Sequence, residues 1–282
     1  MENAGEGLAV LKETAEWVLG ELEEPDGIGR GQALNTLVTV AQTQCALDPE
    51  AGKFETWEAW VTAMQVGCAL FEAATASEGP VPCRIGSHEG PAQVRNLPAT
   101  GPTPYTHAGS WLTSWYLATI CRENDRLDRL ARVPISVLRA SGATFDEYVY
   151  DWVEALQNYW FRRASETWDK LVAAINGTDP EQIQVTDRET MLKQLYPPLE
   201  LFQLYNRREQ EKFNSSLVEF LNWHKQYWTS TEERSQSTNG LVPLGLLAMV
   251  CMAYDNDMPI SVETEYLPKH LVKRSWVGEY DT

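Results

Sequence analysis

Paired cysteines are missing from this chain. Its 282 residues include five cysteines, an odd number, and none of them forms a Cys-x-x-Cys pair. Zinc knuckles and dithiol redox motifs need such close pairs, so the sequence excludes both as local motifs. Four of the cysteines stand in apolar helical contexts, where we expect buried free thiols. These four are Cys45, Cys68, Cys121 and Cys251, and the fifth is Cys83.

Sequence signatures of catalysis are missing as well. There is no His-Glu-x-x-His, no phosphate-binding loop with its lysine, no Gly-x-Gly-x-x-Gly after a strand and no Gly-x-Ser-x-Gly elbow. Only four histidines occur, and no two of them are four residues apart. A metal site would therefore need distant segments to converge. We expect no metal and no other cofactor, and the sequence favours a binding protein over an enzyme.

Positive charge is scarce. The chain has 23 lysines and arginines against 40 aspartates and glutamates, which gives a formal net charge of −17. Such a surface repels phosphate groups, so binding to nucleic acids and docking on anionic membranes are both disfavoured. A basic protein partner would instead be attracted, and its encounter with this chain would be faster.

A secretion signal and a membrane span are not expected either. The first six residues, Met1 to Glu6, contain neither the basic region nor the apolar stretch of a signal peptide. The longest apolar run, Leu241 to Tyr254, is too short to cross a bilayer, so we expect it to form a core helix. These features predict a cytoplasmic protein.

What the sequence has in abundance is helical periodicity. Leu8, Leu11, Ala15, Val18 and Leu22 follow the three-and-four spacing of one buried helix face, and similar patterns recur along most of the chain. We predict an all-α fold, an antiparallel array of many helices joined by short loops. Successive helix pairs of similar size are also compatible with an α-solenoid, although no period repeats residue types. Because no linker interrupts the array, residues 1–282 are interpreted as a single domain.

One segment departs from the helical pattern. Residues 79–104 contain two runs in which apolar and polar side chains alternate, Val81–Gly86 and Gln93–Leu97, around Ser87-His88-Glu89-Gly90. This alternation predicts a β-hairpin near residues 81–97. We interpret the hairpin as an insertion on the helical body, or as the rim of a groove.

Acidic side chains form one notable set, on a helix predicted over Phe145–Phe161. Glu147, Asp151 and Glu154 share one face of this helix through their spacing of four and seven residues. Such a set could contact a basic partner, or bind a metal if it were buried with a histidine. It is also the pattern of an ordinary solvated face. We treat the three carboxylates as the candidate partner-binding site.

An aromatic helix, predicted from about residue 105 to residue 124, offers an alternative site. His107 stands at its start, where the helix dipole would lower the pKa of the imidazole, and Trp111, Trp115 and Tyr116 follow. If these side chains lined a cavity capped by the hairpin, the protein would bind or transform a small molecule. The competing interpretation is that the aromatic rings belong to a large core.

A series of charged residues follows the same helix. The arginines are Arg122, Arg126, Arg129 and Arg132, and the neighbouring acids are Glu123, Asp125 and Asp128. We predict ion pairs between these neighbours rather than a phosphate-binding patch.

Several stretches carry a family resemblance. The first runs from Leu97-Pro98-Ala99-Thr100-Gly101-Pro102-Thr103 through Trp111-Leu112, Arg126-Leu127-Asp128, Val133-Pro134 and Phe145-Asp146-Glu147-Tyr148 to Trp152-Val153-Glu154-Ala155-Leu156-Gln157. The others are Asp187-Arg188-Glu189, Leu195-Tyr196-Pro197-Pro198, Tyr266-Leu267-Pro268-Lys269-His270-Leu271 and Trp276-Val277-Gly278. Together they resemble the immunity protein 49 family of actinobacterial polymorphic-toxin systems. The resemblance extends from about Trp57 to the carboxyl terminus, and residues 1–50 match less clearly.

The resemblance implies a helical cytoplasmic protein that binds and neutralises a cognate toxin, with no defined functional residues to transfer to this chain. An acidic inhibitor could occupy the basic substrate-binding face of a nuclease toxin. Two other functions stay open: a small-molecule-binding protein or enzyme of a biosynthetic cluster, with its pocket around His107, Trp111 and Trp115, and a helical scaffold without a toxin. A toxin gene next door would indicate the first function, biosynthetic genes the second, and neither the third. The sequence specifies no oligomeric state.

Overall fold

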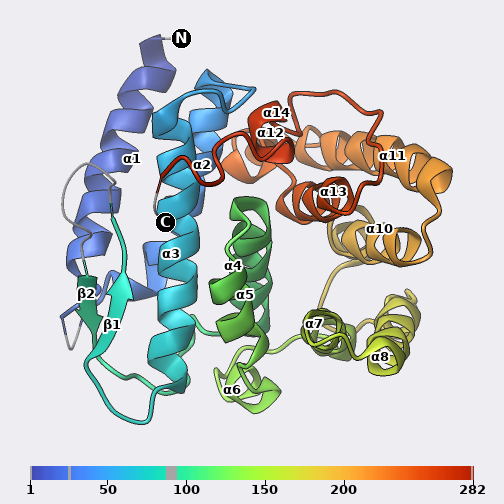
Figure 1. Ribbon diagram of the computed structural model, residues 1–282. Coiled ribbons are helices and arrows are strands. Elements are labelled where there is room, and N and C mark those ends of the chain that lie inside the picture. Colours follow the sequence, from blue (N-terminus) through green and yellow to red (C-terminus); the bar gives the residue numbers. More distant parts are fainter. Residues whose placement is uncertain (1, 25–26, 87–93, 281) are drawn as a thin grey trace.

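Helices form along most of the chain in the computed structural model (Figure 1), which describes residues 2–24, 27–86, 94–280 and 282. The only sheet within these residues is a small antiparallel pair of strands. The prediction of an all-α fold with one small hairpin is therefore confirmed. The buried apolar side chains form one continuous core cluster, which reaches from Leu8 in the first helix to Val272 near the carboxyl end.

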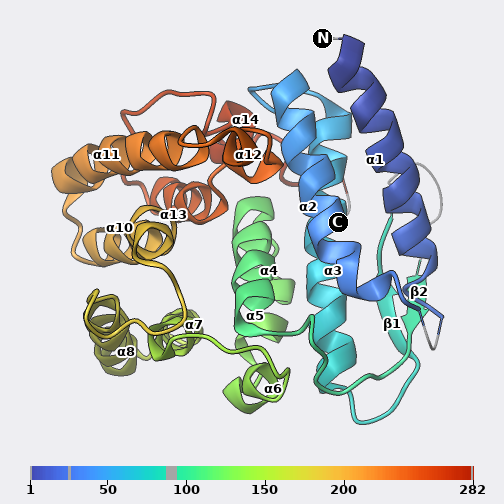
Figure 2. The same cartoon turned by 180° about the vertical axis from the view of Figure 1, so that it is seen from behind.

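Three long helices form one side of the molecule, side by side in both ribbon views (Figures 1 and 2). They are α1 (Glu2–Gly20), α2 (Arg30–Leu47) and α3 (Phe54–Thr75). The face of α1 that carries Leu8, Ala15 and Val18 is buried, as its periodicity predicts. The α3 helix is buried along most of its length, and its Trp60 Nε1 lies 3.3 Å from Cys45 Sγ of α2.

The hairpin packs against these helices. Its strands are β1 (Val81–Arg84) and β2 (Val94–Leu97). Strand β1 contacts α3, and Arg95 Nη1 of β2 donates a hydrogen bond to the Leu19 carbonyl of α1 at 2.9 Å. The predicted turn Ser87–Gly90 lies outside the described residues. The described strands of the hairpin therefore lie against the N-terminal helices.

Three later helix pairs share one kind of connection. They are α4 (Ala108–Cys121) with α5 (Asn124–Ala131), α7 (Glu147–Trp160) with α8 (Ala164–Gly177), and α10 (Tyr196–Asn206) with α11 (Gln210–Trp228). An arginine in the left-handed conformation follows the first helix of each pair: Arg122, Arg162 and Arg208 have φ values of 60°, 57° and 58°. The next backbone N–H then reaches back to a carbonyl five residues earlier, for example from Glu123 to Ala118 at 2.9 Å. This is the Schellman arrangement of a helix end.

The helix pairs do not continue in one direction. In Figures 1 and 2, α3 and α4 are seen lengthwise, whereas α7 and α8 are seen nearly end-on. The array turns between them, around the short helix α6 (Ile135–Arg139), so it is not a regular solenoid. The remaining short elements are α9 (Arg188–Thr190), the π-helix η1 (Met191–Leu195), α12 (Glu232–Ser235) and the 3₁₀ helix η2 (Thr238–Gly240).

The C-terminal part of the chain returns to the central helix α4. Helix α13 (Leu244–Asp255) packs against α4 and α10, and the short helix α14 (Lys269–Val272) contacts both α13 and α4. Among the described residues, Thr238–Asp255 is the one segment long and apolar enough to pass a composition test for a membrane span, and half of it is buried inside the fold. Helix α13 is thus a core helix, as predicted.

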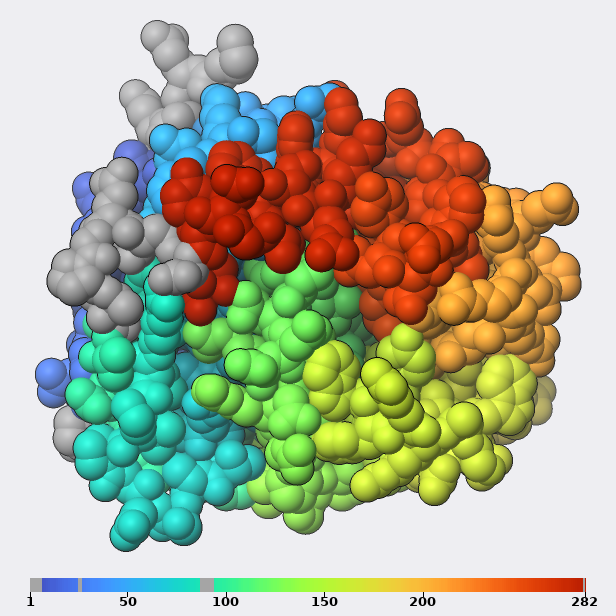
Figure 3. Space-filling view, in the orientation of Figure 1, coloured from blue at the N-terminus to red at the C-terminus, as the bar shows by residue number. Residues whose placement is uncertain are grey.

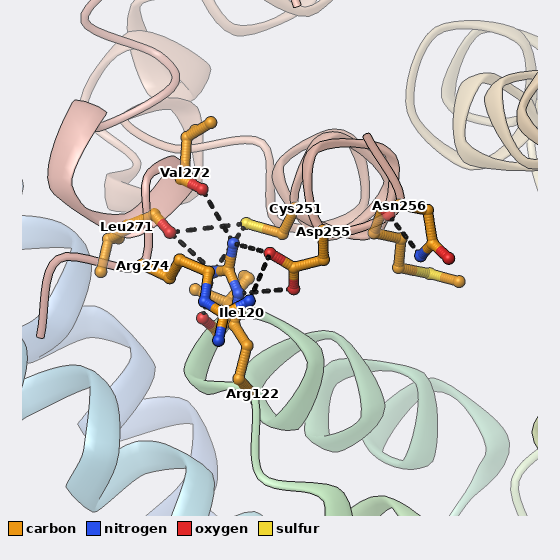
Figure 4. A network of polar contacts seen from close by, with 9 residues as sticks. Ile120, Arg122, Cys251, Asp255, Asn256, Leu271, Val272 and Arg274 are labelled. Carbon is orange, nitrogen blue, oxygen red and sulfur yellow. Dashed lines mark hydrogen bonds and ion pairs between the residues drawn. The ribbon is translucent and has the colours of Figure 1, made fainter. Parts of the chain in front are cut away.

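The side chain of Arg122 joins these elements in a polar network (Figure 4). It is only 8% exposed, and its Nε donates to Asp255 Oδ2 at 2.9 Å. Its Nη1 donates to the Leu271 carbonyl at 2.6 Å, and its Nη2 donates to the Val272 carbonyl at 2.8 Å. The C-terminal segment is thereby fixed against the end of α4.

This network corrects one prediction about the arginines. The acid that pairs with Arg122 is not a sequence neighbour but Asp255, 133 residues further along. Arg129 pairs with Glu72 of α3 at 3.0 Å, and Arg126 donates to a carbonyl of β1. Only Arg132 pairs with one of the expected neighbours, Asp128, at 2.8 Å.

Candidate partner-binding site

The three predicted carboxylates lie on α7 and already have partners within the chain. Lys170 of α8 bridges two of them: its Nζ lies 2.8 Å from Asp151 Oδ1 and 2.7 Å from Glu154 Oε2. Glu147, the first residue of α7, pairs with Arg139 of α6. These ion pairs hold α7 against α8 and α6.

The ion pairs with Lys170 and Arg139 leave the carboxylates of α7 less available to a partner protein. The side chains of Asp151 and Glu154 are only 15% and 33% exposed. The hydrogen bonds that Lys170 donates to the two carboxylates raise its pKa, so its ammonium group keeps its charge. Because three carboxylates face two cations, the local field that would attract a basic partner is weak. The role of this set in partner binding stays a prediction.

Trp111 and Trp115 of the alternative site lie in the core. Their exposed fractions are 0% and 2%, and their rings stack with centroids 5.0 Å apart. Trp111 Nε1 also donates a hydrogen bond to the Leu130 carbonyl of α5 at 3.0 Å. These two aromatic rings therefore fill the space between α4 and α5. They belong to the core, as the competing interpretation of the aromatic helix predicts.

The other two residues of that site also have structural partners. His107 caps α4, where its Nδ1 accepts a hydrogen bond from the Ser110 N–H at 3.1 Å. The pKa of His107 is lowered, as predicted, and burial of the imidazole is the cause that the structure shows. The Tyr116 hydroxyl accepts from Trp152 Nε1 at 2.8 Å, and burial raises its pKa.

One edge of this aromatic cluster does reach a cavity. Trp115 lines a space of about 390 Å³ together with Arg122, Asp255 and Tyr159. Figure 3 shows the surface hollowed where the central helices, α7 and the C-terminal segment meet. Among the described residues, His107, Trp111 and Tyr116 do not line this cavity, and neither do the strands of the hairpin. The structure therefore does not bring the four residues together as the predicted pocket.

A different surface, on α1 and the turn that follows it, presents carboxylates without ion-pair partners among the described residues. Glu13, Glu16 and Glu24 are exposed, and none of them forms an ion pair with a described residue. Lys12 is the one basic residue of α1. Between these carboxylates the helix exposes Trp17, with 46% of its surface accessible. We call these four residues, Glu13, Glu16, Trp17 and Glu24, the α1 surface.

The backbone that follows α1 positions the Trp17 ring. A Cβ atom at Gly29 would lie 3.1 Å from Trp17 Cη2 and 3.0 Å from Glu21 Cγ, so the absence of a side chain at Gly29 lets the indole rest on the chain. The ring thus lies close to the backbone at Gly29, while 46% of the Trp17 surface stays accessible. A supported, half-exposed tryptophan flanked by carboxylates can provide both apolar contact area and attraction to a basic partner.

In the sequence, the carboxylates of this surface belong to an acidic set near the amino end that is interpreted as ordinary solvation: Glu13, Glu16, Glu21, Glu23, Glu24 and Asp26. The periodicity of α1 predicts its buried face, and the residues outside that face were interpreted as solvated. One signal was present in the sequence: Trp17 does not belong to the apolar stripe, which leaves a large aromatic side chain on the polar side of an amphipathic helix.

The chain offers little to a metal ion. Among the described residues, no three His, Cys, Asp or Glu side chains are grouped so that they could hold one. All five cysteines are buried free thiols, and burial raises the pKa of Cys45 to about 12. At neutral pH this thiol is protonated, so it is a poor ligand and a poor nucleophile.

Comparison with known proteins gives one match, to a family model of immunity protein 49 over residues 48–271. Neither the curated proteins nor the solved structures gave a match. The matched range runs from the loop before α3 into α14, and α1 and α2 lie before it. Because the match covers most of the chain, the protein belongs to the immunity protein 49 family.

Proposed function

We propose that this chain is an immunity protein that binds a cognate toxin one to one in the cytoplasm and neutralises it without turnover. The family match over residues 48–271 carries this proposal. The net charge of −17 supports a basic partner, because opposite charge accelerates association and favours the complex. Five free cysteines in reduced form suit a reducing compartment.

The α1 surface is our candidate for the contact with the toxin. Its carboxylates are exposed and unpaired within the described chain, so they can form new ion pairs without breaking old ones. Tryptophan is among the residues whose removal costs most at protein interfaces, and Trp17 is the half-exposed tryptophan of this surface. The partner would present a basic patch around an apolar depression that receives the indole.

The carboxylates of α7 remain a second candidate for the contact. For Asp151 and Glu154 to bind a toxin, Lys170 would have to turn away or be shared with the partner. That rearrangement reduces the gain from any new ion pair. The α1 surface requires no such rearrangement.

The proposal is tested by calorimetric titration of the purified chain with the purified product of an adjacent toxin gene, at low and high salt. We expect one-to-one binding whose affinity falls as salt rises, because screening weakens charge attraction. No heat and no complex with a folded toxin would reject the pairing. Conversion of a small molecule by the chain would instead support the enzyme alternative.

A further inference from the structure

An extended segment between α13 and α14 runs along the edge of the molecule in both ribbon views (Figures 1 and 2). Its residues 258–264 contain neither a helical turn nor a bend. Met258, Ile260 and Val262 are buried or half-buried, whereas the residues between them are exposed. Alternation with a period of two is the pattern of a β-strand with one face on the core. The segment thus has the form of a strand, and no described strand pairs with it.

Asn214 of α11 occupies one edge of this segment. Its Nδ2 donates to the Pro259 carbonyl at 3.0 Å, and its Oδ1 accepts from the Ser261 N–H at 2.8 Å. Because successive residues of a strand direct their backbone groups to opposite edges, those of Ile260 and Val262 point away from Asn214. No described residue forms a hydrogen bond with the backbone N–H or carbonyl of Ile260 or Val262.

A cavity of about 510 Å³ borders the segment. Ile260 and Val262 line it, and its other walls come from α13, α14 and the loop that joins α2 to α3. No described residue of α11 lines it, so the cavity lies on the side of the segment opposite to Asn214. In the α13 wall, Val250 is buried and Tyr254 is 38% exposed. The unpaired edge therefore faces a space with apolar surface.

The charged groups around this cavity favour a basic occupant. Glu263 and Glu265 are exposed, and neither forms an ion pair with a described residue. The opposite wall carries Lys273 and Lys269, and Lys269 pairs with Glu50 at 3.9 Å. Like charges directly across two strands are destabilising, so Glu263 and Glu265 disfavour pairing with a second copy of this segment. Opposite charges across two strands are stabilising.

We propose that this edge binds an extended segment of a partner protein by strand addition. The added strand pairs its backbone with that of Ile260 and Val262. Its inward side chains are apolar and lie in the cavity, and its outward side chains are basic and lie beside Glu263 and Glu265. From residue 260 to residue 264 the edge spans about 13 Å, at about 3.3 Å per residue, so about five partner residues cover it.

This site goes beyond toxin neutralisation. It lies away from α1 in Figures 1 and 2, and it recognises a backbone with alternating side chains rather than the fold of a toxin. Peptides can therefore test it, and their failure to bind would leave the proposed role of the α1 surface unaffected.

The test is amide-resolved NMR of the full chain, titrated with the capped peptide Lys-Val-Lys-Val-Lys-Val-Lys. Strand addition should slow hydrogen exchange at the backbone N–H groups of Ile260 and Val262. It should leave exchange at Ser261 unchanged, because that N–H is already bonded to Asn214. We expect saturable shifts along residues 258–265 with this alternating protection. Shifts confined to the α1 surface, or no saturable shifts, would overturn the proposal.

Three further peptides separate strand pairing from charge attraction. Two are N-methylated, one at its valines and one at its lysines, and the third has glutamate in place of lysine. Since a strand presents alternate residues to each edge, one methylated peptide should bind roughly tenfold more weakly and the other as tightly as the parent. The glutamate peptide should also bind at least about tenfold more weakly. Equal binding of the two methylated peptides would overturn strand pairing.

The double variant Glu263→Lys with Glu265→Lys should bind the parent peptide about tenfold more weakly. Glu166→Lys with Glu181→Lys is the matched control, because it changes the net charge equally at exposed residues that do not line the cavity. The control should stay within about threefold of the wild type. Equal losses in both variants would show that net charge alone attracts the peptide, and would overturn the site. If the first variant fails to fold, Glu263→Gln with Glu265→Gln takes its place, with an expected loss of about threefold.

Discussion

At the residue scale, Arg122 and Arg162 share one backbone conformation and differ in what their side chains do. Both follow a helix with φ near +60°, which strains a residue that carries a Cβ atom. The guanidinium of Arg122 is buried in the network of Figure 4, whereas Arg162 is exposed. The same substitution at the two positions therefore separates backbone strain from side-chain bonding.

We predict opposite effects for the two glycine variants. Arg122→Gly relieves the strain but removes the guanidinium that donates to Asp255 and to the Ile120, Leu271 and Val272 carbonyls, and should lower the free energy of unfolding by about 3 kcal/mol. Arg162→Gly relieves the same strain without losing a buried bond, and should change stability by less than about 1 kcal/mol, upward if at all. Urea unfolding followed by circular dichroism measures both. Equal destabilisation would refute the structural role given to Arg122.

His224 should make stability depend on pH. Its ring is buried, with Nε2 3.0 Å from the Gly240 carbonyl, and burial lowers its pKa to about 4. In the unfolded chain the pKa is about 6.5, so below that pH the unfolded state binds a proton that the folded state refuses. Stability contributed by the neutral ring is present above about pH 6.5 and is lost as pH falls toward 4.

The check is thermal unfolding at several pH values for the wild type and for His224→Gln. The difference in melting temperature between the two should change across the window from about pH 6.5 to 4 and stay constant above it. A constant difference throughout would show that His224 does not titrate in this window.

At the element scale, the sequence predicts helices and strands from local side-chain periodicity. It does not predict contacts between residues that are far apart in the chain. The buried face of α1 follows from side chains three and four residues apart, and the hairpin follows from alternation. The partner of Arg122 could not be predicted, because its pairing with Asp255 depends on how α13 packs on α4. Likewise, the spacing of Asp151 and Glu154 predicted a shared face but not Lys170 opposite them.

The aromatic helix shows the same limit. Its sequence supports both a pocket and a core, because tryptophan suits either environment. The choice depends on whether other helices cover the rings, and α5 and α7 do so here. The sequence shows the carboxylates of the α1 surface but not the exposure of Trp17, because nothing local indicates that no other element covers this ring.

The loop between α8 and α9 depends on a carboxylate at the start of α7. Asp146 accepts hydrogen bonds from the backbone N–H groups of Gln184, Val185 and Thr186 at 2.6, 3.0 and 2.9 Å. Burial alone would raise the pKa of Asp146, but these bonds outweigh it and lower the pKa below its ordinary range. The stability that they give is present above about pH 4 and is lost as pH falls through the lowered pKa.

We predict that Asp146→Ala lowers the free energy of unfolding by about 2 kcal/mol and speeds amide exchange at residues 184–186. Asp179→Ala is the control, since Asp179 accepts one exposed N–H in the same loop and its removal should cost less than about 1 kcal/mol. Hydrogen-exchange mass spectrometry measures both variants. Unchanged exchange at residues 184–186 in the Asp146 variant would show that other contacts hold the loop.

The α1 helix should contribute separately to stability and to binding. Trp17→Ala removes a half-exposed ring, so we expect at most about 1 kcal/mol of lost stability but a loss of about 2 kcal/mol in toxin affinity. Tyr254→Ala, an exposed aromatic residue of α13, is the control and should leave affinity unchanged. Equal affinities of the two variants for the toxin would remove Trp17 from the interface.

At the scale of the whole molecule, the family match and the α1 surface occupy different parts of the chain. The match begins at residue 48, after α2 ends at Leu47, so the helical body from α3 onward is what this protein shares with its family. The α1 surface lies before the match, and the buried face of α1 packs on α2, which also lies before the match. A shared body with a separate contact helix would let related proteins recognise different toxins.

Calorimetric titration of the toxin with two charge-reversed variants of equal net charge is the decisive test of a binding site on α1. One carries Glu13→Lys, Glu16→Lys and Glu24→Lys on the α1 surface. The other carries Glu211→Lys, Glu219→Lys and Glu233→Lys, exposed residues of α11 and α12 without ion pairs in the described chain. We predict that the first variant loses at least tenfold in affinity and most of its salt dependence, while the second stays within about threefold of the wild type. Equal losses in both variants would show that net charge alone attracts the toxin, and would contradict a binding site on α1.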